Sequence, residues 1–154
     1  MDEITIIEMP AQMVLGIRQK GSFKMIPALI GELYQYLQGK EQIISGAPIF
    51  VCHEKDLVEV NNLNETADVE VVLPVREAMP ETDRVKYYEL SGGQMAKIIH
   101  RGPYSECQLA YDKLFAWLTA NNKQIVGPMR EVYINDPSTV APSEIETEIY
   151  APIT

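Results

Sequence analysis

Short apolar stretches bounded by Gly and Pro alternate along the chain with longer stretches whose apolar residues recur at helical spacing. The clearest run begins with a strand pattern at 96–100 and ends with another at 130–134. Between them, an apolar stripe with the 3.6-residue period of an amphipathic helix runs from Ser105 to about Asn121. This region therefore predicts a strand, a helix and a second strand, in that order.

The same order of patterns occurs twice along the chain. In both copies Gln-Met opens a strand, and an apolar-periodic helix follows a glycine-containing turn. Both copies close with a strand that carries a glutamate four residues ahead of a proline, Glu70 before Pro74 and Glu148 before Pro152. The predicted strands are 4–8, 13–18, 49–52 and 70–74 in the first copy and 85–90, 95–100, 130–134 and 148–152 in the second. Each copy is thus a predicted β-β-α-β-β unit.

The whole chain, 1–154, is predicted to be a single domain with internal repeats at about 3–76 and 84–154. The fold class we expect is α+β: two pseudo-symmetric β-β-α-β-β repeats with antiparallel sheets and both main helices packed on one side. A pseudo-two-fold axis would then leave a central ligand cleft between the halves. Two independent small domains are the alternative, which the size of each unit and the short linker at 76–83 disfavour.

Two predicted strands of the second copy carry a glutamate and a tyrosine two residues apart, Glu131 with Tyr133 and Glu148 with Tyr150. Side chains at i and i+2 of a strand share one face. A carboxylate on a buried face costs desolvation free energy unless it is paired, so one alternative is that all four residues face solvent. The other is a concave site for a ligand with apolar bulk and a positive charge, which tyrosine rings and a carboxylate suit.

Three further aromatic residues are candidates for the same cleft. Tyr104 lies at the start of the second helix, and Phe50 occupies the first-copy position that corresponds to Glu131. Trp117 falls on the apolar stripe of the second helix, a position that favours the core over a ligand contact.

Composition narrows the function classes. Thirteen Lys and Arg against 22 Asp and Glu give a net charge of −9, which argues against direct nucleic-acid binding. Neither the two cysteines nor the two histidines have metal-ligand spacing, so we expect no metal and no cofactor.

The start, Met1-Asp2-Glu3, is acidic where a secretory leader is basic, and the apolar runs are too short for a membrane span. We therefore expect a cytoplasmic monomer.

The second half resembles a known family in a series of short motifs: 100–104 (His-Arg-Gly-Pro-Tyr), Trp117, 127–128 (Gly-Pro), 130–137 (Arg-Glu-Val-Tyr-Ile-Asn-Asp-Pro) and 147–149 (Thr-Glu-Ile). They are similar to the GyrI-like small-molecule-binding domain, which is also the effector-binding domain of some AraC- and MerR-type transcription regulators. The resemblance covers nearly the whole chain, and the first half matches mainly by pattern.

The resemblance implies a pair of β-β-α-β-β units, as in the SOUL haem-binding relatives, and a central cleft for amphipathic, often cationic, aromatic compounds. No residue of this chain stands out as an axial haem ligand. In multidrug-binding members, pocket carboxylates meet the charge of the ligand and aromatic rings stack around it. On this chain Glu131 and Glu148 match the strand glutamates of the family, and Tyr133 and Tyr150 match pocket positions on the same strands.

Three functions follow as hypotheses. The first is binding or sequestration of a small hydrophobic cation by a domain without its own DNA-binding module. The second is hydrolysis of strained, cyclopropane-bearing electrophiles, as in some stand-alone relatives, with Glu131 or Glu148 as general base and Tyr133 as acid or orienting group. The third is an interaction with a protein such as gyrase through the acidic surface.

Overall fold

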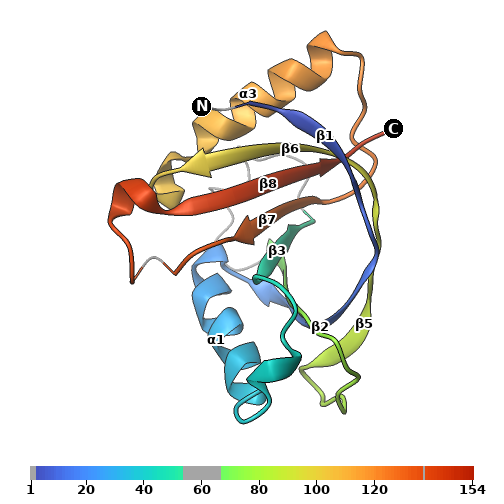
Figure 1. The fold of residues 1–154 in the computed structure, drawn as a ribbon, viewed down its shortest axis with the longest axis vertical. Coiled ribbons are helices and arrows are strands. Elements are labelled where there is room, and N and C mark those ends of the chain that lie inside the picture. The colour runs from blue at the N-terminus through green and yellow to red at the C-terminus, as the bar shows by residue number, and fades with distance from the viewer. Residues whose placement is uncertain (1–2, 54–66, 137) are drawn as a thin grey trace. The chain divides into compact units, whose positions relative to one another are not determined.

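In the computed structural model, the contacts between residues divide the chain into two compact units. Unit 1 comprises Met1–Pro10 and Gly92–Thr154, and unit 2 comprises Ala11–Ser91. The structure describes residues 3–53, 67–136 and 138–154, with the side chain of Ser105 left out; Pro137 of the quoted motif lies outside the described residues. Each unit consists of one antiparallel sheet and one main helix (Figure 1).

Unit 2 has the strand order β5-β2-β4-β3. Its strands are β2 (Gln12–Gly21), β3 (Ile49–Cys52), β4 (Ala67–Pro74) and β5 (Lys86–Leu90). Helix α1 (Ile26–Tyr36) packs against β4 and β2, and short 3-10 helices lie at Phe23–Met25 and Glu41–Ile43. Pro27 sits in the first turn of α1, where its missing N–H costs no hydrogen bond. Leu33 and Leu37 are fully buried.

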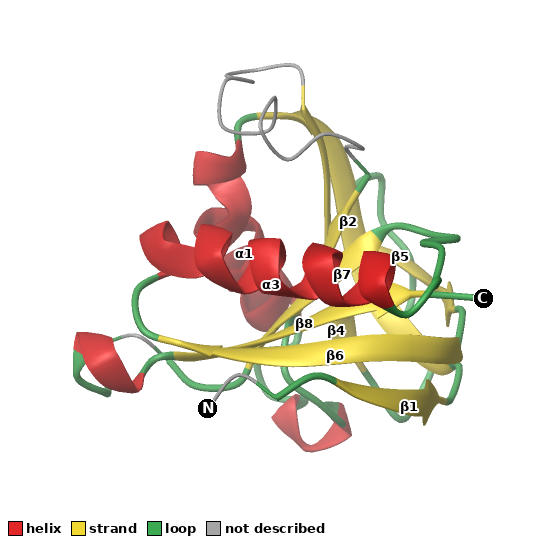
Figure 2. Cartoon of the chain, turned by 90° about the horizontal axis from the view of Figure 1, so that it is seen from above, coloured by secondary structure: helices red, strands yellow, loops and turns green. Residues whose placement is uncertain are grey.

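Unit 1 has the strand order β1-β6-β8-β7. Its strands are β1 (Thr5–Met9), β6 (Gly93–Arg101), β7 (Met129–Tyr133) and β8 (Glu146–Pro152). Helix α3 (Cys107–Ala120) lies across the sheet and contacts β6, and 3-10 helices lie at Tyr104–Glu106 and Pro142–Glu144 (Figure 2). The core side chains Ile98, Leu114 and Ile149 are fully buried.

The α+β class and the predicted strands and helices are confirmed in type and order. The pairing of the first strand of each predicted repeat differs from the expectation. β1 pairs with β6, and β5 pairs with β2, so each of these strands joins the sheet of the other repeat. The compact units therefore do not follow the predicted repeat bounds of 3–76 and 84–154, and the pseudo-two-fold axis stays a prediction.

None of the helices in the described part of the chain has the length and hydrophobicity that a membrane crossing requires.

A glycine in β2 allows a tyrosine to cross this strand. Tyr88 of β5 lies opposite Val14, and Glu70 of β4 lies opposite Arg18, so Gly16 stands between the two on the same face of the sheet. A Cβ atom at Gly16 would lie 2.1 Å from the hydroxyl oxygen of Tyr88. The absence of a side chain at Gly16 therefore lets the phenol reach Glu70, to which it donates a hydrogen bond.

Gly16→Ala should lower the free energy of unfolding by about 1–3 kcal/mol, because the ring of Tyr88 must move away from a well-packed position. Gly31→Ala is the matched control, since no atom lies within 4 Å of a Cβ at this α1 position. The control should gain about 0.5–1 kcal/mol from helix propensity. Urea denaturation of both variants measures the difference, and equal effects would contradict the packing argument.

Candidate functional site

Glu131 is the centre of a cluster of tyrosines in unit 1. It lies on β7, half-buried, and Tyr133 on the same strand donates its hydroxyl hydrogen to Oε1 at 3.0 Å. The hydroxyl of Tyr111, on the buried face of α3, donates to Oε2. Tyr104 completes the cluster, its ring edge-to-face with that of Tyr133 at a centroid distance of 5.4 Å. We call these four residues the Glu131 cluster.

The surroundings of Glu131 disfavour its charged form. Burial raises the pKa of its carboxyl, while the hydrogen bonds from Tyr111 and Tyr133 and the charge of His100 act in the opposite direction. Burial, followed by the charge of Glu131, holds the pKa of Tyr133 well above its ordinary value, so this phenol stays protonated and donates a hydrogen bond. Burial likewise raises the pKa of the Cys107 thiol to about 12, which leaves it protonated and unreactive at neutral pH.

Glu148 lies in a differently composed cluster. The hydroxyl of Tyr150 donates to its Oε1 at 2.6 Å, and the Lys97 ammonium lies 3.2 Å from its Oε2. The same ammonium is 5.7 Å from the centroid of the Tyr150 ring. Burial is the main cause that raises the pKa of Tyr150. Glu148 therefore already has a positive partner within the protein.

The two glutamates face opposite sides of the sheet of unit 1. Directly paired residues of antiparallel strands share a face. Glu131 pairs with Ile149, and Val132 pairs with Glu148, so Glu148 points away from the face that Glu131 shares with Tyr111 of α3. The predicted Glu-x-Tyr pairs are thus each on one face, as expected. The register offsets the two pairs by one residue, so the two glutamates do not share a face, and their places in one ligand site stay predictions.

The remaining candidates are distributed as follows. Tyr104 joins the Glu131 cluster and is 39% exposed. Phe50 lies in unit 2, where it is buried and packs edge-to-face on Phe23 at 5.6 Å. Trp117 is half-buried near the end of α3, and no ring contact or side-chain hydrogen bond links it to the Glu131 cluster within the described residues. The places of Phe50 and Trp117 in a ligand site stay predictions.

Two groups of polar residues were not predicted from the sequence. Tyr111 lies within the apolar helical stretch from Ser105 to about Asn121, where a tyrosine hydroxyl needs a hydrogen-bond partner when buried. Glu70 was noted only as part of the repeat, yet it is buried between Tyr88 and His53. Within the described residues, no group of three or more His, Cys, Asp or Glu side chains is placed to hold a metal ion.

The model of one protein family, described as GyrI-like small molecule binding domain, matches residues 2–154. Among curated protein sequences, none matches this chain significantly. Several solved structures share its fold.

The crystal structure of the EcmrR C-terminal domain has a TM-score of 0.86 at 21% identity, over 100% of this chain and 98% of that one. In the cryo-EM structure of the EcmrR–DNA complex in EcmrR-RPo, the match spans 99% of this chain and 57% of that chain, with a TM-score of 0.83 and 21% identity. SAV2435 bound to tetraphenylphosphonium has a TM-score of 0.60 at 12% identity, over 99% of this chain and 94% of that one. A hydrolase from Listeria innocua has a TM-score of 0.69 at 15% identity, over 99% of this chain and 92% of that one.

The raised pKa of Glu131 predicts a pH-dependent difference between the wild type and Glu131→Gln. Below the ordinary carboxyl pKa, Glu131 is protonated in both the folded and the unfolded chain. As the pH rises towards the raised pKa, the unfolded chain loses this proton first, so the folded protein is destabilised relative to Glu131→Gln. Above the raised pKa the difference should be constant. Urea denaturation from pH 4 to pH 8 measures it, and a wild type that gains stability relative to the variant across this window would contradict the assignment.

Proposed function

Because this chain belongs to the GyrI-like small-molecule-binding domain family, we propose that it binds an amphipathic organic cation through the Glu131 cluster of unit 1. The protein would serve as an effector-binding or sequestering domain for compounds of the multidrug class.

The observation that carries the proposal concerns three glutamates that each accept a hydrogen bond from a tyrosine. They differ in whether a basic side chain also contacts the carboxylate. Glu70 also contacts the imidazole of His53, and Glu148 also contacts the ammonium of Lys97. Among the described residues, Glu131 forms hydrogen bonds only with phenols and has no ion pair. A half-buried carboxylate without an ion pair is costly in the charged form. A ligand cation would supply the missing charge.

The tyrosines of the Glu131 cluster suit a ligand of this kind. Tyr104 and Tyr133 meet edge-to-face, and Tyr104 is 39% exposed, so an aromatic ring is available to a ligand. A cation over such a ring gains about 0.5–2 kcal/mol, depending on its desolvation. The phenols already donate to both oxygens of Glu131, so a ligand without N–H donors would leave these hydrogen bonds intact. The tetraphenylphosphonium bound to SAV2435 is a cation of this type.

Titration calorimetry with tetraphenylphosphonium should show binding by the wild type and a loss of at least about tenfold in affinity, or about 1.4 kcal/mol, for Glu131→Gln. Glu148→Gln is the matched control, because Glu148 faces the other side of the sheet and is paired with Lys97. Its affinity should stay close to that of the wild type.

Equal affinities of the wild type and Glu131→Gln would refute the role of the charge. A loss confined to Glu148→Gln would place the ligand on the opposite face of the sheet.

Hydrolysis of an electrophilic ligand is a second candidate, favoured by a specific feature of Glu131. A carboxylate with a raised pKa is a better proton acceptor, and the hydroxyl of Tyr133 lies 3.0 Å away as an orienting group. A protein of this fold from Listeria innocua is named a hydrolase. Incubation with a cyclopropane-bearing alkylating compound should then give the water adduct in mass spectrometry, with the wild type and not with Glu131→Gln. Equal yields from protein and buffer would eliminate this reaction for that compound class.

A further inference from the structure

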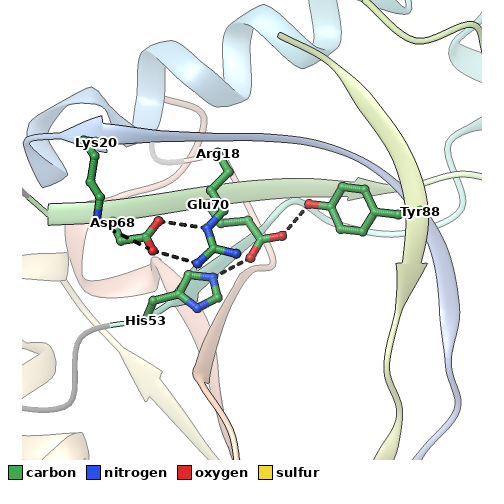
Figure 3. A network of polar contacts seen from close by, with 6 residues as sticks. All are labelled: Arg18, Lys20, His53, Asp68, Glu70 and Tyr88. Atoms are coloured by element: carbon green, nitrogen blue, oxygen red, sulfur yellow. Dashed lines mark hydrogen bonds and ion pairs between the residues drawn. The ribbon is translucent and has the colours of Figure 1, made fainter. Parts of the chain in front are cut away.

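A second cluster of polar side chains lies in unit 2, on residues that the binding proposal does not use (Figure 3). Its centre is Glu70 of β4, which is 6% exposed. The phenol of Tyr88 reaches the carboxylate from β5, and the imidazole of His53 reaches it from the end of β3. A buried carboxylate is thus shared between a phenol and an imidazole.

The hydrogen bonds define the tautomer of the imidazole. Tyr88 donates to Oε2 of Glu70, and Nε2 of His53 lies 2.6 Å from Oε1. An ionised carboxylate can only accept hydrogen bonds, and with Glu70 in that form the hydrogen of this contact belongs to Nε2 of His53. In the neutral ring Nδ1 then has a free lone pair, and no described residue forms a hydrogen bond with it. The His53 side chain is partly exposed, at 20%.

The charged side chains next to Glu70 and His53 mostly form ion pairs with one another. The guanidinium of Arg18 binds both oxygens of Asp68, at 2.9 and 2.7 Å. The Lys20 ammonium is held loosely, 4.0 Å from Asp68, with 71% of its side chain exposed. It can therefore move to a negative charge that forms nearby without breaking a tight ion pair.

We propose that Tyr88, Glu70 and His53 form an acid–base site in unit 2, in which His53 is the general base for the hydrolysis of carboxylic esters. Glu70 orients the imidazole and stabilises the imidazolium, and Tyr88 holds the carboxylate in place. The site belongs to unit 2, and the Glu131 cluster belongs to unit 1.

In the first step Nδ1 takes a proton from water while the oxygen of this water bonds to the ester carbonyl carbon. The carbonyl π electrons move to oxygen and form a tetrahedral oxyanion, which Lys20 is free to approach. When the oxyanion collapses, the bond to the alcohol oxygen breaks and the imidazolium returns the proton to the leaving group. Water is the only co-reactant, and His53 ends as it began.

The first test is direct observation of the tautomer by ¹⁵N NMR of the wild-type chain. The proposal requires the neutral His53 ring to be protonated at Nε2 and bare at Nδ1. A ring protonated at Nδ1 would overturn it without any variant.

The second test is hydrolysis of 4-nitrophenyl acetate by the full chain, compared with N-acetylhistidine at equal concentration and pH. The wild type should exceed this reference by at least about tenfold, since positioned general bases contribute about 10²–10⁴-fold. His53→Gln should reduce the rate to the background. A wild-type rate no higher than that of N-acetylhistidine, or an unchanged rate in His53→Gln, would refute the site.

Tyr88→Phe tests the positioning role of the phenol and has a neighbouring control on the same strand. It should lower the hydrolysis rate and shift its pH profile, because Glu70 loses a hydrogen-bond donor. Tyr87→Phe should leave both unchanged, since the Tyr87 hydroxyl forms no hydrogen bond with any described residue. Identical pH profiles for the two variants would show that Tyr88 has no part in the site. Tetraphenylphosphonium binding, measured on the same variants, should be unaffected, so failure here is distinct from failure of the binding proposal.

Discussion

A carboxylate placed inside a β-sheet needs hydrogen-bond donors, and in this protein tyrosine hydroxyls provide them. Glu70, Glu131 and Glu148 each accept a hydrogen bond from at least one phenol. A phenol suits this role because its ring packs among apolar side chains while its hydroxyl reaches the acid. The second partner of each carboxylate decides what that carboxylate can do. The second partner is an imidazole for Glu70, an ammonium for Glu148 and another phenol for Glu131.

The sheet register separates these roles in space. Glu131 and Glu148 belong to neighbouring paired strands, yet an offset of one residue turns them to opposite faces. Glu131 then shares its face with Tyr111 of α3. Glu148 shares its face with Lys97, its partner in charge. Two similar Glu-x-Tyr sequences therefore acquire different partners, because the register and not the local sequence selects their neighbours.

Much of the fold follows from local sequence. Strands and helices were predictable because period-2 and 3.6-residue patterns reflect one buried face, and turn residues mark the boundaries between them. The exchange of β1 and β5 between the two repeats was not predictable. Strand pairing is a long-range choice, and an edge strand such as Thr5–Met9 carries no local signal for its partner.

The candidate site was predictable only in part for the same reason. The pairing of Glu131 with Tyr133 depends on strand geometry alone, and it is present. The contribution of Tyr111 and the partners of Glu70 depend on which elements pack together. The same dependence explains why Phe50, which aligns with Glu131 in the repeat, is a buried ring against Phe23.

The central claim is that Glu131 is a carboxylate whose positive partner comes from the ligand. The most direct test is whether the protein releases a proton when it binds tetraphenylphosphonium. Titration calorimetry in buffers of different ionisation enthalpy measures this release. The pH should lie between the ordinary carboxyl pKa and the raised pKa of Glu131, where the empty site still holds its proton. The cation should then expel this proton from the wild type, and Glu131→Gln should release none. Binding without proton release, or with equal release from both proteins, would contradict the account.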